Sequence, residues 1–230
     1  MRRNIVTLLF VGSSLLTLAQ GMEETPDKSS PADKLDKLVL DVNHDRWIDA
    51  PDSINTEIYS RGVHINLMYD IPLGESPFAF AIGLGIGSSN IFTDATVVNQ
   101  VDSTGEIFTT LQQFDEDYDY DKNKLSSNYL DIPLEFRFRT KPNEKGQRFK
   151  VTAGAKIGYL INMHSKTIDK EGKYKTFIYP TANDFRYGAF FRIGYGKIGL
   201  NAYYSLSPVF DEGKAITLTQ VSAGLSFLPF

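Results

Sequence analysis

The sequence predicts an all-β protein: a transmembrane antiparallel up-and-down β-barrel of about eight strands. Three observations predict this fold. Apolar residues alternate with small or polar residues at a period of two, short and long connections alternate along the chain, and the faces that are not apolar carry Gly, Ala and Arg. Because successive side chains of a strand point to opposite faces, each predicted strand has one apolar face.

The composition of the chain excludes several functional classes. The chain has 230 residues, a length that is enough for one sizeable domain. Its net charge is -4. The acidic balance argues against nucleic acid as a partner, since nucleic-acid binding favours a basic stripe. The chain has no cysteine, so disulfides, thiolate catalysis and cysteine-ligated metals are excluded.

Residues 1–21 predict a cleaved signal peptide. Two arginines precede an apolar run over residues 5–18, and small residues follow it, as in secretory signals. A retained membrane anchor is the alternative, but the run falls short of the about 20 residues that a spanning helix needs. Residues 22–36 are polar and aperiodic and predict a periplasmic spacer. Residues 37–230 are expected to form the barrel of an exported protein in the bacterial outer membrane.

The clearest predicted strand is F-A-F-A-I-G-L-G-I-G-S-S-N, residues 78–90. Large residues such as Phe80 and Ile82 fill one face, and only Ala and Gly occupy the other as far as Gly87. The same alternation marks the other segments. The predicted strands span residues 38–43, 63–71, 78–90, 130–139, 149–161, 185–193, 198–206 and 221–230.

The connections alternate in length. Residues 72–77, 140–148 and 194–197 are short and rich in turn-forming residues, whereas residues 44–57, 88–124, 165–183 and 207–216 are long and polar. Short turns on one side and long loops on the other are typical of outer-membrane barrels. An even strand number places both ends of the barrel on the short-turn, periplasmic side.

The composition of the two faces favours a membrane barrel over a soluble β-sandwich, which is the alternative. A face of Ala and Gly suits a crowded interior better than a solvent face, and large apolar residues outside suit lipid. The charged residues of the other face are then expected to form a paired interior network. Its predicted members are Asp70, Asp131, Glu135, Arg137, Arg139, Lys150, Lys156, Arg186 and Arg192. A polar plug is the favoured role for this network, and a proton or ion path is the alternative.

No catalytic, cofactor or established metal motif is found. The three histidines are scattered and no G-x-S-x-G occurs, so we expect no enzyme activity and no cofactor. Asp117, Asp119 and Asp121 have the spacing that begins a calcium loop. Lys122 stands where the turn glycine belongs, so these residues are weak metal candidates and a solvated acidic loop is favoured.

Three segments carry a family resemblance: residues 60–92, residues 129–139 (Y-L-D-I-P-L-E-F-R-F-R) and residues 153–161 (A-G-A-K-I-G-Y-L-I). They resemble the PorT-like outer-membrane β-barrel family. The resemblance implies an outer-membrane location and an eight-stranded barrel, and it associates the protein with secretion across that membrane. It transfers no catalytic residue, because the family has no catalytic motif to match.

The sequence therefore leaves two alternative functions. The first is a structural, docking or secretion-associated barrel that contacts outer-membrane lipid and, through residues 88–124 and 165–183, other envelope or secretion proteins. The second is a small porin-like barrel for ions or small solutes, which the narrow bore argues against. A lipid-modifying enzyme would require a Ser–His pair that the sequence does not reveal.

Overall fold

The computed structural model of the chain describes residues 38–101, 103, 105–115, 117–177 and 179–228. The predicted signal peptide, the spacer and the last two residues of the final predicted strand, 229–230, lie outside the described residues. Within these residues no helix is long and apolar enough to cross a membrane. The strands of the barrel wall are β1 (Leu38–Trp47), β2 (Arg61–Pro72), β3 (Phe78–Phe92), β6 (Tyr120–Arg139), β7 (Phe149–Asp169), β9 (Phe185–Tyr195), β10 (Ile198–Ser205) and β11 (Gln220–Phe227).

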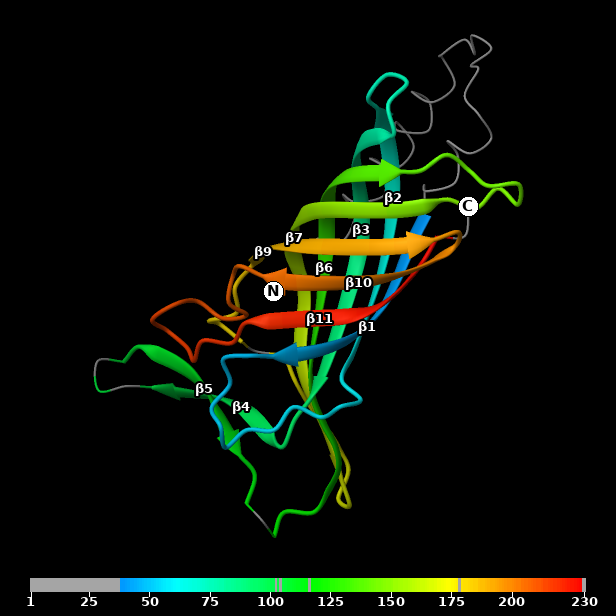
Figure 1. Cartoon of the computed structure of the whole chain (residues 1–230). Coiled ribbons are helices and arrows are strands. Elements are labelled where there is room, and N and C mark those ends of the chain that lie inside the picture. The colour runs from blue at the N-terminus through cyan, green and yellow to red at the C-terminus, as the bar shows by residue number, and fades with distance from the viewer. Residues whose placement is uncertain (1–37, 102, 104, 116, 178, 229–230) are drawn as a thin grey trace, which may run out of the picture. The chain divides into compact units, whose positions relative to one another are not determined.

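These strands form a closed antiparallel barrel (Figure 1). Their order is β6-β3-β2-β1-β11-β10-β9-β7, and pairing of β6 with β7 completes the ring. A short strand, β8 (Lys173–Thr176), extends the sheet beside the end of β7 and is not part of the ring. The predicted fold class is confirmed: the protein is all-β with an eight-stranded barrel.

The faces of the wall have the polarity that the sequence predicts. In β3 the side chain of Ile82 is 44% exposed, whereas that of its neighbour Ala81 is 4% exposed. Large apolar residues point outward along the wall, and charged and small residues point inward. A closed barrel with an apolar exterior satisfies the backbone in lipid, since every strand edge is paired.

The short turns lie at one end of the barrel, which we call the turn end, and the long loops lie at the other, the loop end. The turn between β6 and β7 is fixed by Asn143, whose Oδ1 accepts hydrogen bonds from the amides of Lys145 and Gln147 at 2.9 Å each. Gly146 completes this turn at a φ of 74°, a conformation that favours glycine. In an outer-membrane barrel the turn end faces the periplasm.

The long loops are more structured than the sequence indicated. Residues 88–124 contain the end of β3, a hairpin of β4 (Ala95–Val101) and β5 (Ile107–Gln113), and the start of β6. Residues 165–183 contain the end of β7 and β8. The expectation that these segments are strand-free polar loops is therefore wrong. The upper parts of β6 and β7 were missed because their outward faces are polar, so the apolar outward face that marks the rest of these strands stops below them.

The loop end carries a hydrophobic core of its own, which we call the loop cap. Its buried residues come from four barrel strands, from three connections between strands and from the β4–β5 hairpin. They are Trp47, Ile54, Ile91, Ala95, Leu111, Leu125, Met163, Tyr179, Phe210, Ala215 and Leu218. Backbone hydrogen bonds of 2.9 Å join Thr109 to Lys214 and to Ile216, which ties the hairpin to the connection between β10 and β11.

Candidate functional site

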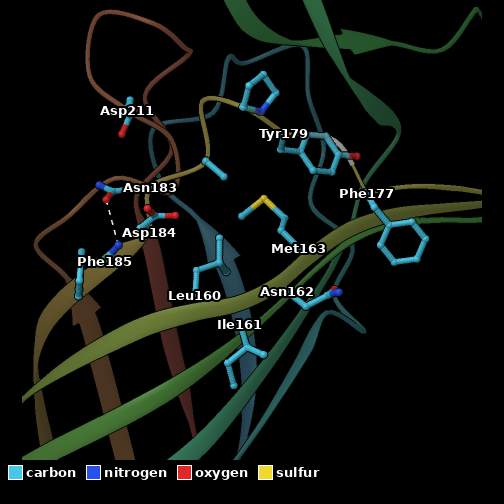
Figure 2. A pocket seen from close by; sticks show the side chains of 12 residues that line it. Leu160, Ile161, Asn162, Met163, Phe177, Tyr179, Asn183, Asp184, Phe185 and Asp211 are labelled. Atoms are coloured by element: carbon cyan, nitrogen blue, oxygen red, sulfur yellow. Dashed lines mark hydrogen bonds between the residues drawn. The ribbon is translucent and has the colours of Figure 1, made fainter. Parts of the chain in front are cut away.

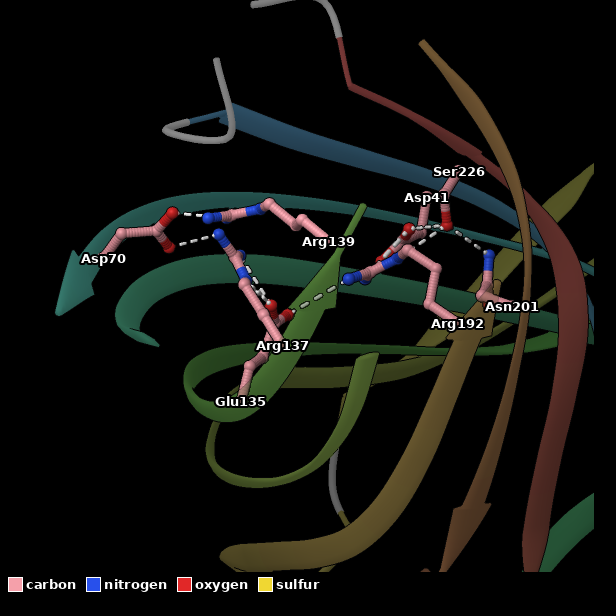
Figure 3. A network of polar contacts seen from close by, with 8 residues as sticks. All are labelled: Asp41, Asp70, Glu135, Arg137, Arg139, Arg192, Asn201 and Ser226. Atoms are coloured by element: carbon pink, nitrogen blue, oxygen red, sulfur yellow. Dashed lines mark hydrogen bonds and ion pairs between the residues drawn. The ribbon is translucent and has the colours of Figure 1, made fainter. Parts of the chain in front are cut away.

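A chain of charged groups crosses the barrel interior toward the turn end (Figure 3). Asp70 accepts hydrogen bonds from both Arg137 and Arg139. Arg137 also pairs with Glu135, whose Oε2 lies 2.5 Å from its Nη2. The second oxygen of Glu135 lies 3.1 Å from Nη1 of Arg192. Each carboxylate therefore shares at least one arginine with a neighbour.

Arg192 carries this chain to the opposite wall. Its Nη2 lies 3.0 Å from Oδ2 of Asp41, and its Nε donates to Ser226 Oγ at 2.9 Å. Ser226 in turn donates to Asp41 at 2.5 Å, and Asn201 donates to Ser226 at 3.0 Å. Figure 3 shows the guanidinium of Arg192 lying between Glu135 and Asp41. This arginine therefore links strands β1, β6, β9 and β11 through the interior.

A second cluster lies nearer the loop end. Arg186 donates to Asp131 through Nη2 at 2.7 and 2.9 Å and through Nε at 3.1 Å. Lys156 lies 2.8 Å from Nδ1 of His64 and 4.0 Å from Oδ2 of Asp131. The Lys156 ammonium group lies 4.0 Å from the ring centroid of Tyr203. Paired charges with aromatic faces beside them satisfy one another inside a narrow barrel.

Glycines make room for this cluster. A Cβ atom on Gly158 would lie 2.3 Å from Oδ1 of Asp131, and one on Gly87 would lie 2.6 Å from Nη2 of Arg186. Such distances are far below van der Waals contact, so any larger residue would displace the ion pair. On the Ala–Gly face of residues 78–90, Gly87 thus leaves space for a charged side chain from another strand.

Little empty space remains between the two charged clusters. The cavity that separates them is lined by residues including Asp41, His64, Glu135 and Lys156, and its volume is about 20 Å³. A water molecule needs roughly 10–15 Å³ of such volume. The cavity therefore holds about one water, and the charged side chains fill the rest of the bore at this level.

All the charged residues that the sequence places inside are found on interior faces, and the ion pairs join most of them. Sequence analysis missed Asp41, Asp45 and His64 as members of the network. Asp41 and Asp45 alternate with outward-facing residues in β1, and this alternation was the available signal. For Asp45 the signal was lost because the predicted strand stopped at residue 43, whereas Asp41 lay within that strand and was not included in the predicted network. His64 shares its face of β2 with Asp70, and this was the available signal for it.

The acidic loop does not gather its carboxylates. Asp119 pairs with Lys170 at 2.5 Å, and both side chains are largely exposed. Among the residues that the structure describes, no group of three or more His, Cys, Asp or Glu side chains is arranged to hold a metal ion. Of the candidates Asp117, Asp119 and Asp121, Asp119 is therefore engaged by a cation of the chain itself.

A cleft of about 620 Å³ opens at the loop end between β7 and β9 (Figure 2). It lies where β7 leaves β9 after Tyr159 and before it pairs with β8 from Ser165 onward. Apolar side chains such as Met163 and Phe177 line it together with Asp184 and Asp211. The cleft has the size of a small-molecule pocket, and its lining combines apolar groups with carboxylates.

The closed ring, the apolar exterior and the charged, filled interior define a transmembrane β-barrel. The family described as outer membrane protein beta-barrel domain matches residues 41–211. The chain belongs to this family and is an outer-membrane β-barrel protein. None of the curated proteins compared with the chain matches it. The matching family is broader than the PorT-like group, so the PorT-specific likeness stays a prediction.

Proposed function

We propose that the protein is a closed, non-catalytic outer-membrane barrel with a structural or docking role in the cell envelope, associated with secretion. The observation that carries this proposal is the filled interior. Asp131, Arg186, Glu135 and Arg192 are each no more than 5% exposed and are joined in ion pairs, and the cavity among the charged residues holds about one water. A bore of this kind supports a plug and offers no continuous path to a hydrated ion.

The loop cap supports the docking part of the proposal. It has its own buried core, which is more structure than a barrel needs to span lipid. At the tip of the β4–β5 hairpin the side chains of Val101, Ile107 and Phe108 are exposed, Val101 by 69%. Grouped apolar residues exposed to water mark interaction sites. The tip is therefore the surface through which residues 88–124 would contact another envelope protein.

The histidines support a non-catalytic role. His44 Nδ1 lies 2.9 Å from the carbonyl oxygen of Ser60, and His164 Nδ1 lies 3.0 Å from Oδ1 of Asn162. His64 contacts Lys156. Nδ1 of each ring thus has a structural partner, and none of these three contacts is to the hydroxyl or thiol that a base in nucleophilic catalysis would need within hydrogen-bond reach.

Conductance tests the closed barrel. We expect the purified protein, inserted in planar lipid bilayers, to show no steady open current at moderate voltage. The alternative, a porin-like barrel, is favoured only by the charged interior. Steady single-channel steps that scale with salt concentration would favour this alternative and overturn the plug.

Comparison of exported proteins tests the docking role. We expect a deletion strain to lose a defined set of secreted or surface proteins, and the wild-type chain to restore them. The triple variant Val101→Ser, Ile107→Ser, Phe108→Ser is expected to insert normally and to fail in restoration. Ile58→Ser, at another exposed apolar position of the loop end, is the matched control and is expected to restore export. An unchanged export profile in the deletion strain contradicts the secretion-associated role.

A further inference from the structure

Four cationic side chains and one histidine gather on the outward face of the wall at the loop end. We call Arg61, Lys124, His164, Lys166 and Lys175 the basic belt. Lys166 in β7 stands directly opposite Lys124 in β6 on one side and opposite Lys175 in β8 on the other. Directly opposed residues of antiparallel strands share a face, so three ammonium groups lie side by side across three strands.

Arg61 and His164 complete the belt in the adjoining row of the sheet. His164 pairs with Ser126, Ser126 with Asn90, and Asn90 with Arg61. The guanidinium of Arg61 and the ammonium group of Lys124 both approach the ring of Phe92, at 6.0 and 5.7 Å from its centroid. The belt therefore runs from β2 to β8 around one side of the barrel.

The part of the chain that the structure describes supplies no ion pair to this belt. Among the described residues, no carboxylate is within ion-pair distance of Arg61, Lys124, Lys166 or Lys175. The ammonium group of Lys124 donates to the neutral Oδ1 of Asn90 at 2.5 Å, and the charges of Arg61, Lys166 and Lys175 act on it repulsively. Like charges placed directly opposite one another destabilise a sheet. A bound anion would convert this repulsion into attraction.

Two carboxylates near the belt have other partners. Asp119 pairs with Lys170, and Asp169 accepts a hydrogen bond from Tyr118 at 2.6 Å. Both lie at the tip of the β6–β7 extension, beyond the row that pairs Lys122 with Ile168. Among the described residues, the cations of the belt therefore face outward without an ion pair.

The height of the belt identifies the source of the anion. Going up the wall, the apolar exterior ends at residues such as Val63, Ile86 and Leu130. Polar Ser88 and Asn128 follow on the same outward face, and the cations come next. Arg61 lies two residues from Val63, which is about 7 Å along a strand. Lysine and arginine side chains at the end of an apolar band extend to the headgroup level of the lipid.

We propose that the basic belt binds the phosphate groups of an anionic lipid headgroup in the outer leaflet. Several cations in a row suit a headgroup with more than one phosphate, because charge-assisted hydrogen bonds to phosphate are among the strongest in proteins. Tyr59, whose ring centroid lies 4.8 Å from that of Phe92, adds an aromatic group of the kind enriched at membrane interfaces.

Native mass spectrometry of the folded full chain in detergent micelles tests the proposal, with phosphorylated lipid A as the probe. We expect the wild type to retain lipid A. The variant Lys124→Gln, Lys166→Gln, Lys175→Gln should bind it about 100-fold more weakly, since each cation near an anionic membrane surface contributes about 1 kcal/mol. The triple Lys→Arg variant should retain binding, and binding should weaken as ionic strength rises.

The matched control removes the same number of charges at the turn end, with Lys141→Gln, Lys145→Gln and Lys197→Gln, and should bind as the wild type does. Dephosphorylated lipid A should be retained poorly. Equal retention of lipid A by the wild type and the belt variant overturns the proposal. Competition by millimolar inorganic phosphate as effective as that by lipid A would assign the belt to free phosphate. Binding of polyglutamate with no displacement by lipid A would assign it to an acidic protein, and either result also overturns the proposal.

Discussion

Arg186 and Asp131 form a fully enclosed ion pair at the centre of the barrel, with Nη2 of the arginine 2.7 Å from Oδ2 of the aspartate. Two further hydrogen bonds, from Nη2 and Nε to Oδ1, fix the plane of the guanidinium. The aromatic ring of Tyr129 lies beneath it, 3.9 Å from Cζ. The pair joins β6 to β9 across β7, so it holds together strands that are not hydrogen-bonded neighbours.

Removing one partner of this pair is expected to destabilise the barrel strongly. Asp131→Asn leaves the buried Arg186 without its counter-charge, and breaking a buried pair in this way costs about 3–5 kcal/mol. Urea unfolding of the protein in lipid vesicles measures the loss. Asp119→Asn, which breaks the exposed pair with Lys170, serves as control and should leave the unfolding midpoint unchanged. Similar midpoints for the two variants would show that the interior pair adds no stability.

A charge on the lipid-facing wall is expected to prevent assembly. Ile82→Arg places a guanidinium on the outward face of β3 at a position that is 44% exposed to the surroundings of the barrel. A charge at the bilayer midplane of such a barrel costs about 2–4 kcal/mol. The fraction of protein that shows the heat-modifiable gel shift after refolding into vesicles reports assembly. The control variant Gln100→Arg, at an exposed site of β4, should fold as the wild type does. If both variants fold to the same extent, Ile82 does not face lipid.

The space left by an interior glycine is expected to be essential. In Gly158→Ala the added methyl group would lie 2.3 Å from Oδ1 of Asp131 and 3.0 Å from Arg186. Overpacking of this kind costs about 1–3 kcal/mol, measured again by urea unfolding. Gly172→Ala is the control, because nothing lies within 4 Å of the added atom there. If Gly158→Ala and Gly172→Ala have the same unfolding midpoint, the interior side chains can move aside for the added methyl group and the prediction is wrong.

Alkaline titration is expected to reveal the contact at the tip of the β6–β7 extension. The hydrogen bond from Tyr118 to the Asp169 carboxylate raises the pKa of Tyr118 to about 12. A raised pKa in the folded state means that this contact stabilises the tip fully below pH 10, the ordinary value for tyrosine, and is lost as the pH rises through about 12. Ultraviolet absorbance at 295 nm, compared between the wild type and Tyr118→Phe, isolates this tyrosine. Asp169→Asn should return its titration toward pH 10, and an ordinary titration in the wild type would contradict the contact.

The sequence predicts the membrane-embedded wall well because lipid imposes one rule on every strand there. Apolar residues such as Ile82 and Leu130 must face outward, and the alternation that results is visible without a structure. Beyond the bilayer the rule reverses. Leu125 and Met163 face inward to the loop cap, whereas Lys124 and His164 face outward. The expected strands therefore ended where the outward face turned polar, and the upper parts of β6 and β7 were assigned to loops.

The interior charges were predictable as a group, and their partners were not. Alternation shows that Asp131 and Arg186 both point inward. Their pairing depends on the register that places Asp131 opposite Gly158 and Gly158 opposite Arg186. Register across three strands is set by turn lengths and by the bulge between Asn128 and Tyr129, and neither is apparent from the local sequence.

The pairing of β1 with β11 also constrains the order of assembly. Asp41 and Ser226 are 185 residues apart in the chain and share a hydrogen bond across this junction. β1 and β11 each lack one hydrogen-bonded neighbour until they pair with each other. The ring therefore closes only after the C-terminal strand has been added to the sheet. Until then β1 and the growing end of the sheet present open edges, which aggregate readily when exposed. Long-range closure of this kind is also intrinsically slow, so these edges stay unpaired for longer than those of a local hairpin.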